Sequence, residues 1–290
     1  MDLSIIIVNY KTYELTKNAT KSVLETVKSP YEIFVVDNDS QDGSYEKLKS
    51  TFKDEIASGK IKLIANDYNQ GFAVANNIAI KESKGDFILL LNSDAIVKDG
   101  SIDNSLDYIK NHNDIGAIGP KILLPNGELD KAAKRSFPNP KNSFYRLFGF
   151  SKINKNSEDN NYNLNDLDPD GIYEVDSLVG AFMIVRKETI EQIGLLDEDY
   201  FMYGEDIDWC YRIKEAGWKV IYYGKAEIIH YKGSSSKKQK SKLIYEFHRS
   251  MYLFYNKHYN NKYSFLTKLA VYLGILVLLI IKLFLNIFKK

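Results

Sequence analysis

Three carboxylates stand within four positions of one short segment of the chain. Glu205, Asp206 and Asp208 follow Gly204 and open a stretch with helical spacing that ends near Gly217. Because neighbouring like charges repel, a carboxyl group in such a cluster has a raised pKa, which suits a general base. Acidic residues are also favoured in the first turn of a helix by the helix dipole. The cluster alone therefore leaves two interpretations open, a helix cap or a catalytic base.

A second polar group follows a predicted buried strand. Asn92, Ser93 and Asp94 come directly after the apolar run 87–91. Residues two apart in an extended chain point the same way, so Asn92 and Asp94 can face one ligand. One carboxylate, completed by phosphate and water oxygens, is how Mg²⁺ or Mn²⁺ is usually held at a nucleotide site. The competing interpretation is an Asx turn that closes the strand.

His230 and Asp37 are further candidates whose value depends on their neighbours. His230 ends the last predicted strand, and imidazole is a common ligand of transition metals, although a lone histidine is more often structural. Its interpretation as a ligand requires Asp94 nearby. Asp37 opens a polar loop that ends at Gly43, where an ordinary turn residue is the alternative.

These residues lie on an alternation of short apolar strands and helices, which indicates an α/β sheet with mostly parallel strands. Ligands bind beyond the carboxyl ends of the strands in such a sheet. Polar residues follow four strands there, at 9–10, 37–40, 66–70 and 92–94. We predict strands at 3–8, 32–36, 61–65, 87–91 and 115–118, and helices at 15–27, 45–52, 72–84 and 102–111.

The second half of the body is less regular. Residues 120–175 are rich in Pro, Asn and Asp, which predicts an insertion over the sheet edge. A strand over 178–185, a short helix over 188–193 and the acidic helix follow. Two strands, at 219–223 and 226–230, are predicted to end the body.

Several enzyme classes lack their sequence signatures here. The chain has no G-x-G-x-x-G and no Walker lysine loop, which argues against a dinucleotide oxidoreductase or a P-loop hydrolase. It has no G-x-S-x-G either, so acyl transfer through a serine nucleophile is not expected. The single cysteine, Cys210, cannot form an internal disulfide, and no Cys/His spacing indicates a zinc site.

A net charge of +1 hides a strong asymmetry between body and tail. Residues 231–290 contain 12 Lys and Arg against one acid, Glu246, which gives +11, whereas residues 1–230 carry −10. An acidic body predicts cation chemistry, and a basic tail predicts an anionic surface as its partner. Because the tail is also apolar, we expect that surface to be a membrane and not a nucleic acid.

The apolar tail sets the expected location. The run 269–281 continues past Lys282 to Phe288 and so reaches the ~20 residues that span a bilayer. The uninterrupted part is shorter, so an interfacial helix with snorkelling lysines stays open, as does a soluble core helix. We expect attachment to the cytoplasmic face of the membrane, because the first residues form a strand and lack a basic leader. The predicted divisions are 1–236, 237–263 and 264–290.

The order of these motifs resembles that of the inverting family 2 glycosyltransferases, which have the GT-A fold, and within them the bacterial rhamnosyltransferase-like group. The resemblance runs from about residue 4 to 236. It implies a Rossmann-like, mostly parallel central sheet flanked by helices, followed here by a C-terminal hydrophobic helix. The motifs are 6–10 (IIVNY), 35–38 (VVDN), 69–77 (NQGFAVANN), 90–94 (LLNSD), 179–183 (VGAFM), 196–198 (LDE), 201–208 (FMYGEDID), and His230 with 233–235 (GSS).

The resemblance implies a donor site for a nucleotide sugar. Asn9, Tyr10 and Asp37 would hold the nucleoside base and ribose. The wall against the sugar and phosphates would be formed by Asn69, Gly71, Phe72 and Asn76. The other residues expected in donor binding are Val8, Asn92, Ser93 and Asp94. Arg249 is a separate candidate to reach the pyrophosphate, since the Q-x-x-R-W element of processive relatives is absent after His230.

The resemblance also implies a metal and a base. Asp94 and His230 would hold Mg²⁺ or Mn²⁺ on the diphosphate, and Asn92 replaces the first Asp of the D-x-D motif that many relatives carry. That replacement leaves one carboxylate where two are expected and makes His230 more important. Asp206 would be the catalytic base, with Glu205 beside it as the alternative.

The implied reaction is the transfer of one sugar from dTDP-rhamnose or a UDP-sugar to a hydroxyl group, with inversion. The acceptor would be a glycan or a lipid-linked glycan in cell-surface polysaccharide synthesis. The Q-x-x-R-W element of processive members does not follow His230, which favours a single transfer. Two alternatives remain: a non-catalytic sugar-nucleotide or glycan-binding partner in a membrane assembly, and a nucleotidyltransferase. The latter would need a Gly-rich loop with Arg and Lys after the first strand, where residues 11–14 (KTYE) offer none.

Overall fold

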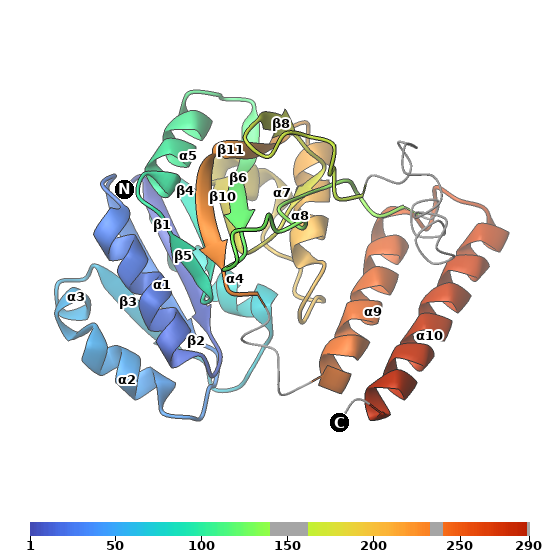
Figure 1. The fold of residues 1–290 in the computed structure, drawn as a ribbon, viewed down its shortest axis with the longest axis horizontal. Helices are drawn as coiled ribbons and strands as arrows, with labels where there is room; N and C mark the ends of the chain where they lie inside the picture. Colours follow the sequence, from blue (N-terminus) through green and yellow to red (C-terminus); the bar gives the residue numbers. More distant parts are fainter. Residues whose placement is uncertain (140–161, 233–239, 289–290) are drawn as a thin grey trace.

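The computed structural model describes residues 1–139, 162–232 and 240–288 (Figure 1). Within this part of the chain, nine strands form one mixed sheet along the order β3-β2-β1-β4-β10-β6-β11-β5, with β8 also paired to β11. The predicted α/β fold with a mostly parallel sheet is therefore confirmed. The 233–235 motif and residues 140–161 of the expected insertion lie outside the described residues.

The first half of the sheet is parallel, as predicted. β1, β2 and β4 are short, largely apolar and almost wholly buried, which is typical of strands covered on both faces, whereas the edge strand β3 is mostly half-buried or exposed. The connecting segments include α1, α2, α3 and α4. The bounds are β1 Leu3–Asn9, α1 Tyr13–Thr26, β2 Tyr31–Asp37, α2 Ser44–Thr51, α3 Lys53–Ala57, β3 Ile61–Ala65, α4 Phe72–Glu82 and β4 Phe87–Asn92.

The second half of the sheet mixes directions. β10 runs antiparallel between β4 and β6, β11 runs parallel to β6, and β5 and β8 pair antiparallel with β11. Hence β6 and β11 point the same way as β1 to β4. The bounds are β5 Ala95–Val97, α5 Ser101–Lys110, β6 Ile115–Leu123, β8 Ile172–Glu174, β10 Phe182–Arg186, α7 Lys187–Ile193, α8 Glu205–Glu215 and β11 Lys219–His230.

Two predicted boundaries were wrong. The strands expected at 219–223 and 226–230 are one strand, β11, whose register against β6 shifts between Tyr223 and Glu227. The strand expected over 178–185 is divided: β9 (Ser177–Leu178) pairs with β7 (Lys134–Arg135), and β10 begins only at Phe182. A turn at Val179–Ala181 therefore leads the chain from one sheet to the other.

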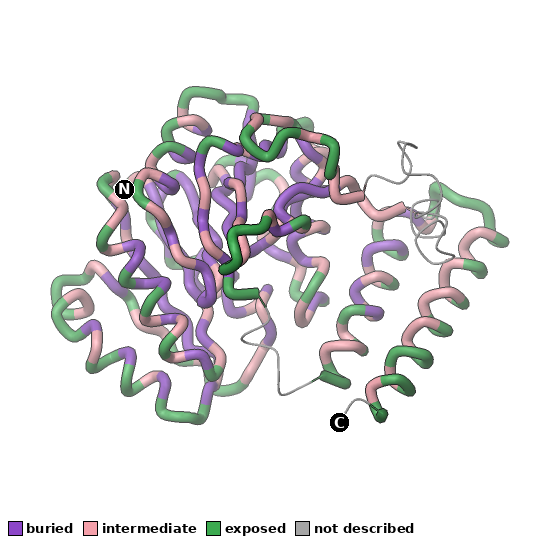
Figure 2. Tube along the Cα trace, in the orientation of Figure 1, coloured by how far each residue is buried: buried purple, intermediate pink, exposed green. Residues whose placement is uncertain are grey.

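Two helices stand beside the body. α9 (Lys240–His258) and α10 (Phe265–Ile287) lie next to each other at the end of the molecule opposite α2 and α3 (Figure 1). Burial is concentrated in the sheet and its covering helices, and no residue of α10 is buried (Figure 2). Within the described residues, α10 alone has the length and apolar composition to cross a membrane. The chain divisions at 236 and 263 stay predictions.

Candidate active site

The carboxyl edge of the sheet collects residues from four strands. Asn9, Asp37, Asn92 and His230 are the last residues of β1, β2, β4 and β11, which run in the same direction. Asn9 lies in register with Asp37, and Val8 with Asn92. Open α/β sheets bind their ligands at this edge. The structure brings these predicted site residues together, while their roles in binding stay predictions.

Asn9 and Asp37 belong to one buried polar network. Asn9 Nδ2 donates to Asp37 Oδ2 (2.6 Å) and to Ser40 Oγ (2.9 Å). Asn9 Oδ1 accepts hydrogen bonds from the hydroxyls of Thr12 (3.1 Å) and Thr16 (2.7 Å). Because both Asn9 and Asp37 are buried, these bonds satisfy groups that would otherwise be costly to desolvate. They also fix the shapes of the loops that follow β1 and β2.

Asn38 was not among the predicted site residues, yet it joins two loops of the edge. Its Nδ2 donates to Asn69 Oδ1 (3.0 Å), and its Oδ1 accepts from Asn66 Nδ2 (3.0 Å) and from the Gln70 backbone N–H (3.2 Å). Asn38 thereby holds the loop after β3 against the loop after β2. The sequence signal that could have indicated Asn38 as a site residue is its place in the VVDN motif at 35–38.

Gly71 brings the start of α4 against the loop before α8. The backbone N–H of Phe72 donates to the carbonyl of Phe201 at 2.8 Å. Gly71 has a φ of +87°, and a Cβ there would lie 2.4 Å from the same carbonyl oxygen, so only glycine fits without a shift. Asn76 turns to its own helix and donates to the carbonyl of Phe72 (2.8 Å). The 69–72 loop is thus fixed to the segment that carries the acidic cluster.

Asp94 and His230 form a compact corner at this edge, as required by their interpretation as metal ligands. His230 Nε2 lies 3.1 Å from Asp94 Oδ1 and 3.5 Å from Asn92 Nδ2. The Asp94–His230 separation is that of a direct hydrogen bond, and it also suits two ligands of one divalent cation once the proton between the two atoms has left. Within the described residues, no three His, Cys, Asp or Glu side chains are grouped to hold a metal. Substrate and water oxygens would therefore have to complete the shell.

Asp130 lies behind His230 and was not predicted. Its Oδ2 is 3.6 Å from His230 Nδ1, and it also accepts from Lys232 Nζ (2.9 Å) and from the Ala132 backbone N–H (3.0 Å). Burial acts to lower the pKa of His230, but the contacts with Asp130 and Asp94 outweigh it and raise that pKa to about 9. At 3.6 Å from Asp130, His230 Nδ1 makes no hydrogen bond, so Asp130 acts on the imidazole through its negative charge.

Asp206 sits in a buried ion pair at the start of α8. Its Oδ2 accepts from Arg135 Nη2 (2.7 Å) and from the Gly180 backbone N–H (3.1 Å), and its Oδ1 accepts from the Ile207 N–H (2.8 Å). Burial acts to lower the pKa of Arg135, but the charge of Asp206 outweighs it and the pKa of the guanidinium is raised. A carboxylate accepts about four hydrogen bonds. One position on Oδ1 is therefore left for a further donor.

Glu205 differs sharply from its neighbour. It is 7% exposed, and its Oε2 has no hydrogen-bond partner. Burial and then the negative charge of Asp206 raise the pKa of Glu205 well above its usual value of 4.5. Desolvation without a partner favours the neutral acid. The two adjacent carboxyl groups thus have different surroundings: Asp206 has a cation and backbone donors, whereas one oxygen of Glu205 has no partner.

The third carboxylate of the cluster, Asp208, is structural. It accepts from Arg212 Nε (2.9 Å) on its own helix and contacts His258 Nε2 (2.7 Å) on α9. Burial acts to raise the pKa of Asp208, but the contacts with His258 and Arg212 outweigh it and lower that pKa. Asp208 is therefore neither the helix cap nor the catalytic base considered for this cluster. It joins α8 to α9.

A two-residue segment links the acidic pair to the metal corner. Gly180 donates its backbone N–H to Asp206, and the carbonyl of Ala181 accepts from the backbone N–H of Asn92 at 3.0 Å. The turn at Val179–Ala181 therefore lies between the two groups of ionisable side chains. It fixes their spacing, because both contacts are made by backbone atoms of adjacent residues.

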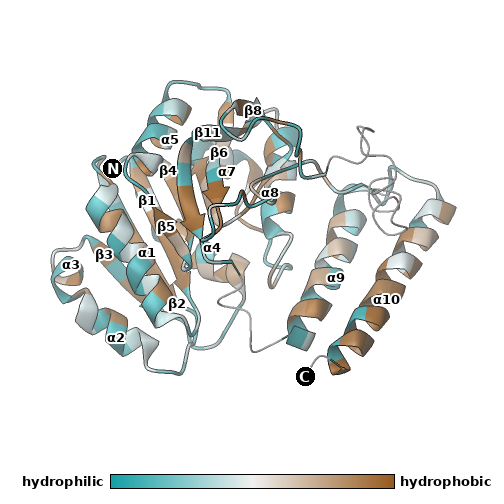
Figure 3. Ribbon diagram, viewed as in Figure 1, coloured by the Kyte–Doolittle hydropathy of each residue, from teal (hydrophilic) through white to brown (hydrophobic). Residues whose placement is uncertain are grey.

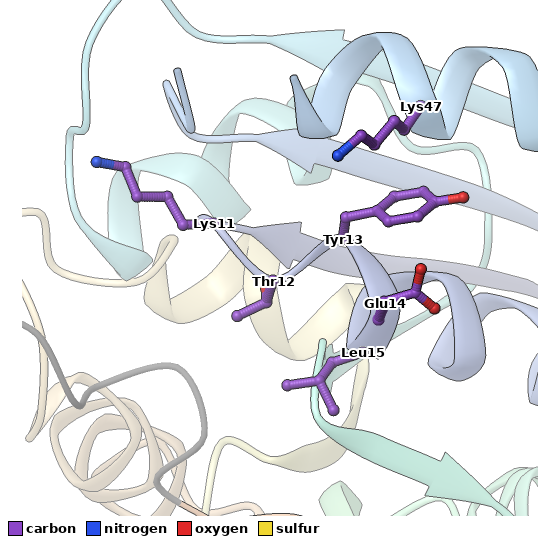
Figure 4. A pocket seen from close by; sticks show the side chains of 6 residues that line it. All are labelled: Lys11, Thr12, Tyr13, Glu14, Leu15 and Lys47. Carbon is purple, nitrogen blue, oxygen red and sulfur yellow. The ribbon is translucent and has the colours of Figure 1, made fainter. Parts of the chain in front are cut away.

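The remaining predicted residues lie around these groups. Ser93 Oγ is 3.3 Å from Thr12 Oγ1, and this contact joins the loops after β4 and β1. The centroid of the Tyr10 ring lies 5.2 Å from Lys11 Nζ. Arg249 lies on α9 and donates to the carbonyl of Asp199 (2.6 Å), so its predicted reach to a pyrophosphate has no contact in support. A hollow beside this edge (Figure 4) includes neither the metal corner nor the acidic pair; its lining is Lys11, Thr12, Tyr13, Glu14, Leu15 and Lys47.

Comparison with known sequences places the chain in a family. Residues 4–167 match Glycosyl transferase family 2, which is more than half of the chain. The N-acetylglucosaminyl-diphospho-decaprenol L-rhamnosyltransferase of Mycobacterium tuberculosis is 27% identical over 263 residues, 87% of this chain and 83% of that protein. The rhamnosyltransferase WbbL of Escherichia coli is 32% identical over 177 residues, 56% of this chain and 61% of that protein.

A solved structure supports the fold. GalNAc-T7, determined with UDP, GalNAc and Mn²⁺, superposes with a TM-score of 0.61 at 17% identity. The match covers 79% of this chain and 44% of that longer protein. At this identity the likeness concerns the fold alone, and it agrees with the GT-A architecture expected from the motif order.

The first prediction concerns the metal corner. In titration calorimetry with UDP and Mn²⁺, Asp94→Ala should abolish the effect of Mn²⁺ on UDP affinity, and His230→Ala should weaken it. Asp130→Asn should lower the affinity for Mn²⁺ by up to about 10-fold, the low end for a carboxylate behind a ligating histidine, because no hydrogen bond joins the two side chains. Asp99→Ala, an exposed carboxylate beyond β5, serves as the matched control. Equal UDP affinity with and without Mn²⁺ in the parent would contradict the assignment.

The second prediction concerns Glu205. The folded chain keeps this proton to higher pH than the unfolded chain, so the parent should lose stability as pH rises from 4.5 through the raised pKa. Glu205→Gln cannot ionise, and its free energy of unfolding should change less across that window. Glu215→Gln, at the exposed end of the same helix, should follow the parent. Parallel curves for Glu205→Gln and the parent in denaturant titrations would show that Glu205 is not held neutral.

Proposed function

Since the chain belongs to Glycosyl transferase family 2, we propose that it transfers a single sugar from a nucleotide-diphosphate sugar to a hydroxyl of a glycan or lipid-linked acceptor, with inversion. The observation that carries the proposal is the pairing of two sites at one sheet edge. Asp94 and His230 form one site, Glu205 and Asp206 form the other, and the turn at Val179–Ala181 joins them.

The donor would lie along the loops that follow β1, β2 and β4. The Asn9–Asp37 network and the Asn38 contacts shape the side of the edge where a nucleoside would bind. The diphosphate would reach Asp94 and His230, whose separation fits Mg²⁺ or Mn²⁺. A divalent cation held there neutralises the negative charge that develops on the departing diphosphate.

Asp206 is the proposed base. It forms an ion pair with Arg135, and one acceptor position on Oδ1 is left for the proton of an incoming hydroxyl. Burial and then the negative charge of Asp206 raise the pKa of Glu205 and favour its neutral form, which cannot accept that proton. One base without a second nucleophile gives one displacement, and the acceptor oxygen attacks from the face opposite the leaving group. The configuration at the anomeric carbon is then inverted.

The acceptor and location follow from two independent features. The mycobacterial relative is named for a lipid-linked substrate, N-acetylglucosaminyl-diphospho-decaprenol, and for the transfer of L-rhamnose. This chain also has the apolar helix α10 and a tail with a charge of +11. We therefore propose attachment at the cytoplasmic face of the membrane, a role in cell-surface polysaccharide synthesis, and dTDP-rhamnose or a UDP-sugar as donor.

Product analysis tests the class of reaction. A panel of nucleotide sugars incubated with the protein, Mn²⁺ and a polyprenyl-diphosphate-linked N-acetylglucosamine should release free nucleoside diphosphate from one donor. Release of pyrophosphate would instead indicate a nucleotidyltransferase. Binding of the donor without any product would favour the non-catalytic alternative, a membrane-attached assembly partner.

The third prediction separates the two neighbouring carboxyl groups. Asp206→Asn should lower turnover by about 10² or more, the usual contribution of a general base, while nucleotide affinity changes by less than about twofold. Glu205→Gln should retain far more activity, because it resembles the neutral acid. Unfolding midpoints of both variants distinguish lost chemistry from a lost fold, since Asp206→Asn also leaves Arg135 without its charge partner. An active Asp206→Asn beside an inactive Glu205→Gln would reverse the assignment.

A further inference from the structure

α9 stands between the body and α10 and is tied to the body by polar contacts. Arg249 donates to the carbonyl of Asp199, and Lys257 Nζ lies 2.8 Å from the carboxylate of the same residue. Near its end, His258 contacts the buried Asp208 of α8 (2.7 Å). One face of α9 is therefore fixed to the 197–201 loop and to α8. It belongs structurally to the catalytic body.

The opposite face of α9 packs along most of α10. Ser241 Oγ accepts from Asn286 Nδ2 (3.0 Å) at one end, and Asn256 Oδ1 accepts from the Tyr272 hydroxyl (3.2 Å) near the other. The ring of Tyr272 also contacts Tyr252 and Tyr255, with centroids 5.2 and 5.7 Å apart. Fifteen residues of helix separate the two contacts on α9, which is about 22 Å. The two helices form an antiparallel pair over that length.

The outer surface of α10 is apolar and exposed. Figure 3 shows α10 as a mostly hydrophobic helix at the edge of the molecule. A soluble protein rarely exposes so large an apolar surface unless a membrane or a partner covers it. The basic residues around the helix, within a tail of charge +11, favour an anionic lipid surface as that partner. The exposed side chains include Phe265, Leu266, Leu269, Leu273, Leu276, Val277, Ile280, Ile281, Phe284, Leu285, Ile287 and Phe288.

The contacts of α9 decide how α10 meets the bilayer. If α10 crossed the membrane while paired with α9, then Glu246, Arg249 and Lys257 would enter the hydrocarbon, at a high cost for each charge. If α10 crossed alone, the contacts of Asn286 and Tyr272 with α9 would be lost. A helix that lies in the interface keeps both sets of contacts and lets Lys282 extend to the headgroups.

We propose that α10 lies flat in an anionic membrane interface, antiparallel to α9, and does not span the bilayer. The proposal rests on the proposed function only in taking a membrane as the partner. α9 then acts as a rigid spacer, about one helix diameter thick, between the bilayer and the catalytic body.

The same arrangement sets the position of the active site relative to the membrane. Phe247 of α9 contacts Tyr203 with ring centroids 6.0 Å apart. A Cβ at Gly204 would lie 3.0 Å from Ser250 Cβ, so α9 packs directly on the turn before Glu205 and Asp206. A flat α10 therefore holds the proposed base at a constant height above the headgroups, where a lipid-linked acceptor presents its sugar.

Cross-linking of the full chain tests whether the helix pair stays closed on membranes. Ser241→Cys with Asn286→Cys should form a disulfide under oxidation, while the native Cys210 is buried and stays unreactive. On vesicles of phosphatidylglycerol and phosphatidylcholine, the oxidised and reduced forms should bind within about twofold of each other, with each single variant as control. Loss of binding by tenfold or more on oxidation, or failure of the bond to form on vesicles, would overturn the proposal.

Depth measurements give a second, independent readout. Nitroxide labels at Leu269→Cys and Phe284→Cys, both exposed positions, should report the same depth in the bilayer to within a few Å. A spanning helix would separate them by about 22 Å along the membrane normal. Such a difference, or a parent protein that does not bind vesicles, would refute the flat arrangement. Sugar transfer does not enter either measurement, so failure of the proposed function would leave these results unaffected.

Discussion

The buried ion pair between Arg135 and Asp206 is the interaction on which the candidate site depends. Removing two charges from water is costly, and their attraction compensates only when the geometry is good and further hydrogen bonds satisfy both groups. Here Asp206 also accepts the Gly180 and Ile207 backbone N–H groups, and Arg135 also donates to the Leu178 carbonyl. The pair therefore joins β7, β9 and the start of α8. Breaking it would leave a buried charge without a partner.

This ion pair also explains how adjacent carboxyl groups acquire different properties. Asp206 has a cation and two backbone donors, whereas one oxygen of Glu205 has no partner in the buried interior. Since two neighbouring negative charges repel, burial beside Asp206 raises the pKa of Glu205 and favours its protonated form. The metal corner uses a related arrangement, in which His230 lies between Asp94 and Asp130. The guanidinium of Arg135 stabilises Asp206, and the imidazolium form of His230 stabilises Asp94 and Asp130 until a divalent cation would displace the proton from Nε2.

Sequence reasoning found the part of the fold that has strong periodic signals. Apolar β-branched runs alternate with helices in the first half, and the residues that end those strands, such as Asn9 and Asp37, meet at one edge. Strands of two or three residues, such as β5 and β7, are too short to give a periodic pattern. The two predicted final strands are one because β11 continues through an irregular stretch around Gly224.

The site residues that the sequence did not predict were missed for one common reason. Asp130 and Arg135 lie in an irregular segment rich in Pro, Asn and Asp, and their partners, His230 and Asp206, are 71 or more residues away along the chain. No local pattern reports such a contact. The sequence indicates one of the two contacts of Asp208, because Arg212 lies four residues later on the same helix face. It gives no indication of the other contact, with His258, which lies 50 residues away along the chain.

Anomalous diffraction from crystals soaked with Mn²⁺ and an inert analogue of the nucleotide sugar would locate the metal and the sugar together. We expect one manganese peak at roughly 2.0–2.3 Å from both the Asp94 carboxylate and His230 Nε2. We also expect the Asp206 carboxylate to face the anomeric carbon from the side opposite the diphosphate. A manganese ion bound at Glu205 and Asp206, or a sugar placed away from Asp206, would overturn the assignment of the metal ligands and the base.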